Sequence, residues 1–209
     1  AYRYYQGFKI DQEGMICGFD PAKSEMMDGY LELPSENCIG IRRGTFSGVG
    51  TGIFEIYIPE NIQNIENGAF SELGELTWIE AGGTDGYTAR DGILFSGTEL
   101  AAFPAGRTGI FEMPKDVTAI RASAFANTNG GIIVLGIKEK NGIFMPDGLN
   151  KQQIDTYKKR FWDCAHNKEK VSATMLAERD VYETDIDGNF VLLFRIPRAS
   201  YDIRPVYLT

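Results

Sequence analysis

The sequence has little of the chemistry on which disulfide frameworks, metal sites and many active sites depend. Among its 209 residues the cysteines are Cys17, Cys38 and Cys164, and the one histidine is His166. An odd number of widely spaced cysteines fits neither a disulfide framework nor a Cys-x-x-Cys metal site. A zinc site needs more His and Cys ligands than these. We therefore expect no metal ion and no cofactor, and we name no catalytic residue.

Cys164 and His166 are close in sequence, which raises the alternative of a catalytic pair. On a helix, residues two apart do not face each other, so these two side chains would make a poor nucleophile and base. The pattern favours a buried cysteine and a surface histidine instead.

Long apolar runs are also missing. No stretch approaches the roughly 18 apolar residues of a membrane span, so we expect no integral membrane protein. The chain starts at Ala1 with neither an initiator methionine nor the apolar core of a signal peptide, which is typical of an excised or processed piece. A hydrophobic share of 43% is too high for a disordered chain.

Charge and glycine are unevenly distributed along the sequence. Residues 1–128 hold 9 Lys and Arg against 18 Asp and Glu, whereas residues 129–209 hold 12 against 11. The first part has 18 glycines and the second has 6. A chain of this length is large enough for two small domains with separate cores, and the composition favours two modules.

The first part contains an internal repeat. Each copy has an apolar strand that ends in proline, then an isoleucine, then an Ala-Phe or Thr-Phe pair whose Phe follows the isoleucine by five residues. The copies are Tyr30–Pro34 with Ile41 and Thr45-Phe46, Ile56–Pro59 with Ile65 and Ala69-Phe70, and Phe111–Pro114 with Ile120 and Ala124-Phe125.

Each part of this repeat has a physical reason. Proline ends strand pairing because it has no N–H to donate. The second apolar position (Ile41, Ile65 and Ile120) is expected to return to the core. Such a unit cannot bury its apolar face alone, so neighbouring coils must stack into a solenoid. Between the last two copies, Tyr87–Phe95 and Leu100–Pro104 predict two strands joined by a hairpin turn at Ser96–Thr98.

These motifs resemble the BspA-like family of leucine-rich repeats, including its Asp-Gly-Ile-Leu-Phe insert at Asp91–Phe95. The similarity covers about residues 10–128. It implies a curved solenoid that binds protein partners, often at bacterial surfaces, and it implies no active site. Glu55, Glu66, Glu72 and Glu75 are then expected on a solvated acidic face, with paired catalytic carboxylates as the alternative.

The second part has a different, α+β pattern. Ile132–Lys138 predicts one near-continuous apolar strand with both faces covered. Asn150 can cap a helix that runs to about Cys164, with Ile154, Tyr157 and Phe161 on one face and Lys151, Lys158 and Lys159 largely away from it. Ser172 is expected to cap a short second helix. A hairpin is predicted from strands at Asp180–Ile186 and Phe190–Ile196 joined by an Asp187-Gly188 turn. An edge strand is predicted at Arg204–Leu208.

This part is similar to the Schlafen AlbA-like domain, a DNA-binding module. The similarity covers about residues 119–209, and the motifs that carry it are Ser123–Gly131, Ile133–Glu139, Lys170–Ala173, Val191–Ala199 and Arg204–Tyr207. That family normally opens with a strand and a helix carrying Glu and Lys, a place taken here by the last repeat. The resemblance therefore implies nucleic-acid binding rather than nuclease-like chemistry.

Basic residues of the second part are the candidate nucleic-acid contacts. The candidates are Lys158, Lys159, Arg160, Arg195, Arg198 and Arg204. They would contact phosphates, with Tyr201 or Trp162 as a stacking face, and the alternative is ordinary surface charge. Phe161 and Trp162 are otherwise expected in the core. Gly130-Gly131 predicts a turn before a strand rather than a phosphate cradle, because no Lys-Ser/Thr follows.

The sequence thus predicts an α+β chain: a leucine-rich-repeat solenoid at 1–128 and a small α+β domain at 129–209, with residues 119–131 satisfying both patterns. The leading function is a non-enzymatic binding protein, with a protein partner on the repeat and DNA or RNA on the second module. The alternatives are a surface or adhesion repeat protein with no nucleic-acid role and a nucleotide- or nucleic-acid-processing enzyme. The compartment stays open between cytoplasm and cell surface.

Overall fold

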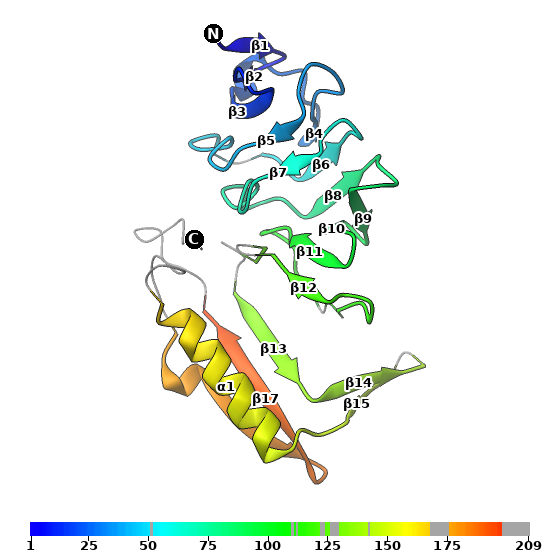
Figure 1. Cartoon of the computed structure of the whole chain (residues 1–209), viewed down its shortest axis with the longest axis vertical. Coiled ribbons are helices and arrows are strands. Elements are labelled where there is room, and N and C mark those ends of the chain that lie inside the picture. The colour runs from blue at the N-terminus through cyan, green and yellow to red at the C-terminus, as the bar shows by residue number, and fades with distance from the viewer. Residues whose placement is uncertain are drawn as a thin grey trace. The chain divides into compact units, whose positions relative to one another are not determined.

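The structure, a computed structural model, describes residues 1–50, 52–109, 111, 113–121, 124–125, 130–141, 143–167 and 176–197. The chain divides into two compact units, Ala1–Asn129 and Gly130–Tyr207 (Figure 1). We call them unit 1 and unit 2.

The described part of unit 1 consists of short strands and one 3-10 turn at Pro21–Lys23. The strands are β1 (Arg3–Tyr5), β2 (Phe8–Ile10), β3 (Met15–Phe19), β4 (Tyr30–Glu32), β5 (Gly40–Ile41), β6 (Glu55–Ile58), β7 (Asn64–Ile65), β8 (Trp78–Ala81), β9 (Tyr87–Arg90), β10 (Ile93–Ser96), β11 (Glu99–Ala102) and β12 (Ala119–Ile120).

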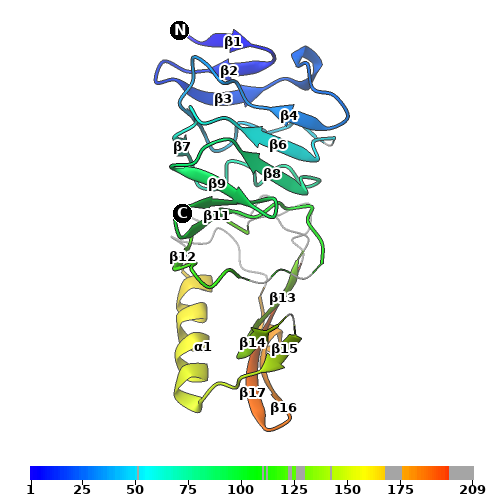
Figure 2. The ribbon, with the colours of Figure 1, turned by 90° about the vertical axis from the view of Figure 1, so that its right-hand side faces the viewer.

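The repeat forms a solenoid, because successive copies add strands to two parallel ladders. One sheet has the order β4-β6-β8, and β5 and β7 extend a second sheet beyond β3. Figure 2 shows β4, β6 and β8 one below another. Leu31, Ile56 and Ile79 are paired in register and fully buried between the ladders. The predicted fold class, a repeat solenoid followed by an α+β region, is confirmed.

Phenylalanines connect the coils through the core. Phe19 lies 4.7 Å from Phe8 and 5.9 Å from Phe46 between ring centroids, and Phe46 lies 6.2 Å from Phe70. A second set joins Phe103 to Phe125 at 4.9 Å. The Phe of each repeat therefore contacts a Phe of a neighbouring coil.

Two expectations for the repeat are wrong. The stretch after Tyr87 forms three antiparallel strands, β9, β10 and β11, because Asp91 and Gly92 both have positive φ and make a turn of their own. Ile120 does not return to the core: it is 54% exposed, whereas Ile41 and Ile65 are buried. Its strand, β12, pairs only with β11 among the described residues, so no further coil covers it.

Of the four glutamates expected on one solvated face, Glu66 and Glu75 are hydrogen-bonded to neighbouring coils, whereas Glu55 is exposed. Glu66 accepts a hydrogen bond from Arg42, whose guanidinium also binds Asp11 and Glu13 from the N-terminal hairpin. Glu75 accepts from the Gly52 N–H at 2.7 Å. Burial would raise the pKa of Asp11, but hydrogen bonds from Arg42 and from two backbone N–H groups together lower it. These carboxylates therefore join neighbouring coils.

Unit 2 has one helix and five strands among its described residues. They are β13 (Gly131–Leu135), β14 (Ile137–Lys140), β15 (Ile143–Pro146), α1 (Lys151–Ala165), β16 (Val181–Ile186) and β17 (Asn189–Ile196), with a 3-10 turn at Glu178–Asp180. The sheet order is β13-β17-β16, antiparallel throughout, and β14 and β15 form a separate hairpin.

Helix α1 covers one face of this sheet. Asn150 caps it in a capping box with Gln153, as the sequence predicts. Ile154 is buried, and Phe161 lies 4.5 Å from Phe194 of β17 between ring centroids. Tyr157, expected on the same apolar face, is 36% exposed. The Asp187-Gly188 turn is present, with positive φ at both residues as a type I′ turn requires.

The expected continuous strand at Ile132–Lys138 is wrong. Gly136 has a φ of 94°, a conformation that L side chains rarely adopt, and it breaks the run into β13 and β14. Ile132, Ile133 and Val134 are 60%, 47% and 40% exposed, so neither face is covered as expected. The predicted Ser172 helix and the Arg204–Leu208 strand lie outside the described residues.

Candidate nucleic-acid interface

Three consecutive basic residues of α1 point in different directions. Successive helical residues are about 100° apart around the axis, so all three cannot share one surface, although two neighbours can. Lys158 is directed at β16, where it forms an ion pair with Glu183 and both side chains are 29% exposed. That pair lowers the pKa of Glu183. Lys158, expected away from the packed face, instead joins the helix to the sheet.

Lys159 and Arg160 are exposed on the outer side of α1. Within residues 1–167 and 176–197, apart from the gaps noted above, neither of them makes an ion pair or a hydrogen bond. Their charges are therefore available to a ligand.

Arg195 lies on the other side of the sheet. Side chains alternate along a strand, and its neighbours in β17, Leu192 and Phe194, belong to the cluster that packs with α1. Arg195 faces away from the helix and binds the buried Asp180 at 2.7 Å and 3.0 Å. It therefore does not extend a strip that begins at Lys159 and Arg160. Arg198, Arg204 and Tyr201 lie outside the described residues, and a nucleic-acid role for all six basic residues stays a prediction.

Trp162 belongs to the core of unit 2 rather than to an open stacking surface. It is half-buried, packs edge-on against Phe161 at 5.2 Å and stacks on His166 at 4.9 Å. Cys164 is exposed, which corrects the expectation of a buried thiol: it lies outside the face formed by Ile154, Phe161 and Ala165. Gly130 has a φ of 81° and Gly131 begins β13, the arrangement of a turn before a strand.

Neither a metal cluster nor a membrane-spanning helix is found among the described residues. No group of three or more His, Cys, Asp or Glu side chains among them is arranged to hold a metal ion. No helix in that part of the chain is long and apolar enough to cross a membrane.

Comparison with known protein families gives a match in the second half of the chain. Residues 111–207 match the model of the Schlafen, AlbA_2 family. The resemblance inferred from the sequence motifs is confirmed. The match to the AlbA_2 family includes Lys159, Arg160 and all the described strands of unit 2. No curated protein matches the chain.

Two solved structures are similar to the chain over about half its length. A leucine-rich repeat protein from Eubacterium ventriosum is 26% identical with a TM-score of 0.42, over 46% of this chain and 26% of that one. The pneumococcal vaccine antigen PcpA is 18% identical with a TM-score of 0.40, over 53% of this chain and 33% of that one. The match thus spans a third or less of either relative.

The AlbA_2 match begins inside unit 1. Phe111 lies 5.3 Å from Phe103 between ring centroids, and Ala124 is buried in the same cluster as Ile93 and Leu100. These residues therefore pack with the last coils of the repeat, although the family pattern already includes them. This overlap agrees with the shared pattern that the sequence shows at residues 119–131.

Proposed function

We propose that the protein is a binding protein in which unit 1 is a repeat scaffold for protein partners and unit 2 contacts nucleic acid. The observation that carries the second part is a pair of exposed cations, Lys159 and Arg160, without partners among the described residues, inside the AlbA_2 match. Cations on an exposed helix face suit phosphates, whose neutralisation supplies most sequence-independent affinity for nucleic acids.

Binding of short DNA and RNA, duplex and single-stranded, tests this proposal across a range of salt concentrations. The double variant Lys159→Ala/Arg160→Ala is expected to weaken duplex binding and to reduce the slope of log K against log salt by about 2, since each lost phosphate contact removes about one unit. Fluorescence anisotropy on the full chain gives both quantities.

The matched control removes the same charge from unit 1. Lys9 lies over the Tyr2 ring and Lys23 pairs with Asp20, so Lys9→Ala/Lys23→Ala leaves unit 2 untouched. We expect it to retain the wild-type salt slope. A control variant that loses as much affinity as the α1 variant, or a wild-type protein that binds none of these nucleic acids at low salt, would refute the nucleic-acid role.

The second candidate is a repeat interaction protein with no nucleic-acid role. It is favoured by the ion pairs of Lys158 with Glu183 and of Arg195 with Asp180, which occupy half of the described candidate cations. Under this candidate the wild-type chain binds no nucleic acid at low salt, and the same titration decides between the two.

A further inference from the structure

The outward face of the sheet β4-β6-β8 alternates aromatic rings with carboxylates. The strand pairing places side chains of β4, β6 and β8 in two rows. One row is Tyr30, Glu55 and Trp78, and the next is Glu32, Tyr57 and Glu80. Leu31, Ile56 and Ile79 point the other way, into the core. Neighbouring strands lie about 4.8 Å apart, so each ring has a carboxylate directly beside it. We call Tyr30, Glu32, Glu55, Tyr57, Trp78 and Glu80 the aromatic–acidic face.

The carboxylates of this face have no cation of their own. Glu32, Glu55 and Glu80 are exposed, and within the described part of unit 1 none of them forms an ion pair. This distinguishes them from Glu66 and Glu99, which bind Arg42 and Arg121. The face therefore presents three unneutralised negative charges.

The Trp78 ring is held in place, and the rings of Tyr30 and Tyr57 are open to a cation. Trp78 lies against the backbone of Gly92, where an added Cβ would lie 2.5 Å from the indole, and the Arg107 guanidinium is 5.9 Å from the ring. No such cation lies over Tyr30 or Tyr57 among the described residues. A Lys or Arg within about 6 Å of an aromatic face is attracted to it, most strongly when desolvated.

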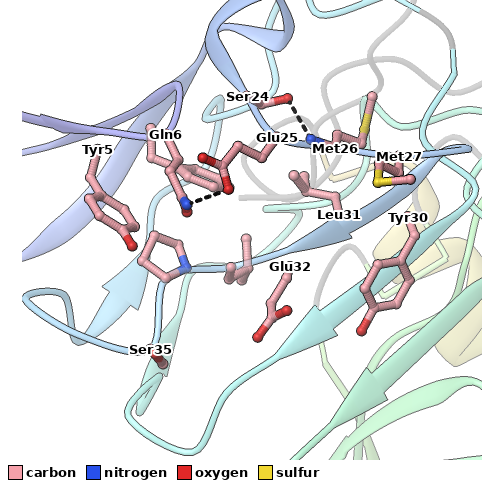
Figure 3. Close-up of a pocket in the computed structure, with 13 residues that line it drawn as sticks. Tyr5, Gln6, Ser24, Glu25, Met26, Met27, Tyr30, Leu31, Glu32 and Ser35 are labelled. Atoms are coloured by element: carbon pink, nitrogen blue, oxygen red, sulfur yellow. Dashed lines mark hydrogen bonds between the residues drawn. The ribbon is translucent and has the colours of Figure 1, made fainter.

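A pocket of about 380 Å³ continues the face beyond β4. Figure 3 shows Tyr30, Glu32, Tyr5 and Glu25 around this pocket, so both rings and carboxylates line it. Gln6 donates a hydrogen bond to Glu25 at 2.9 Å. Burial raises the pKa of Tyr30, and the nearby charges of Glu32, Glu80 and Glu55 raise it further.

We propose that the aromatic–acidic face and the adjoining pocket bind an extended polypeptide segment rich in arginine or lysine. This rests on the proposed role of unit 1 as a scaffold for protein partners and names the chemistry of the partner. The occupant is expected to be cationic for two reasons. The first 128 residues contain 18 acidic and 9 basic residues, and the carboxylates of the aromatic–acidic face form no ion pair among the described residues. Phosphate-bearing ligands are repelled by the same charges.

An extended segment matches the geometry of the face. Alternate side chains of an extended chain repeat about every 6.6–6.8 Å, close to the separation of the two rows of the face along its strands. Several cations of one segment can therefore occupy neighbouring ring and carboxylate positions at once. A small amine would fill only one such position.

Binding of labelled hexa-arginine to the full chain tests the proposal, with hexa-citrulline as its neutral counterpart of the same shape. The variant Glu55→Gln/Glu80→Gln is expected to weaken hexa-arginine binding about tenfold at low salt, from the loss of two exposed charge contacts. Tyr57→Leu keeps an apolar side chain and is expected to weaken binding about threefold, as loss of a cation–π contact does. Tyr30→Leu repeats this test at a more exposed position.

The matched control, Glu36→Gln/Glu72→Gln, removes two carboxylates from turns outside the sheet. It is expected to bind hexa-arginine as the wild type does. Equal weakening in this control, unchanged binding in both tyrosine variants, or equal affinity for spermine would overturn the proposal.

Hexa-citrulline separates failure of this inference from failure of the scaffold role. If it binds as tightly as hexa-arginine and the tyrosine variants weaken both, the face is a docking surface but the cationic partner is wrong. If neither peptide binds, the inference is overturned, and the nucleic-acid titration of unit 2 remains independent of it.

Discussion

Replacement of Phe46 by alanine is expected to lower the free energy of unfolding of unit 1 by about 3–5 kcal/mol, the usual cost of removing a buried phenylalanine. Phe46 is 1% exposed and lies between Phe19 and Phe70 in the ladder that joins successive coils. Because each coil is buried by its neighbours, a cavity at this position weakens the stack on both sides.

The two tryptophans let this loss be assigned to one unit. Trp78 lies in unit 1 and Trp162 in unit 2, so Trp162→Phe and Trp78→Phe backgrounds each leave a single fluorescent reporter. In urea titrations, Phe46→Ala should move the Trp78 transition to lower denaturant and leave the Trp162 transition in place. Phe54→Ala is the matched control: Phe54 is 43% exposed, and its removal should change stability by less than about 1 kcal/mol.

This experiment also tests the predicted division into domains at 1–128 and 129–209. Separate transitions are expected for two domains with their own cores. If Trp78 and Trp162 instead report one common urea transition, and Phe46→Ala shifts it for both reporters, that division is contradicted.

The repeat could be predicted where the same residue types recur at the same spacing. The Ile-to-Phe spacing of five places Ile41 with Phe46 and Ile65 with Phe70 in the buried coils of the structure. Strand β8 was not predicted, because Gly82 stands where the other copies have proline. Its place in the sheet is set by pairing with β6, and no residue within β8 itself signals that contact.

In unit 2, features set by a few neighbouring residues could be predicted from the sequence, whereas contacts between distant residues could not. The Asn150 cap and the Asp187-Gly188 turn act over a few residues and were predicted. The β14–β15 hairpin was missed although Asn141-Gly142 is a strong turn signal. The pairing of Lys158 with Glu183 joins residues 25 apart, so only the folded sheet shows that this cation is occupied.

Loss of the Asp180 carboxylate is expected to destabilise unit 2. Asp180 is 2% exposed, accepts hydrogen bonds from Arg195 and caps the Ala177 N–H at 2.9 Å, thereby fixing the entry to β16. Asp180→Asn should lower the melting temperature reported by Trp162 by about 5–10 °C, the range for an interaction of this kind in a unit of this size. Asp163 is exposed and forms no ion pair or hydrogen bond with the described residues. The control Asp163→Asn should therefore leave the melting temperature unchanged.

The pH dependence of this effect follows from the same contacts. The Ala177 N–H and the Arg195 guanidinium favour the charged carboxylate and outweigh its burial, so the pKa of Asp180 is lowered from its usual 3.8. A group with a lowered pKa stabilises the folded state fully above its unfolded pKa and loses that effect as the pH falls through its folded pKa. The difference in melting temperature between wild type and Asp180→Asn should therefore be constant down to about pH 4 and shrink below it. If this difference in melting temperature instead grows as the pH falls, the folded state stabilises the protonated form of Asp180. The ion pair with Arg195 then does not hold β17 to the turn before β16.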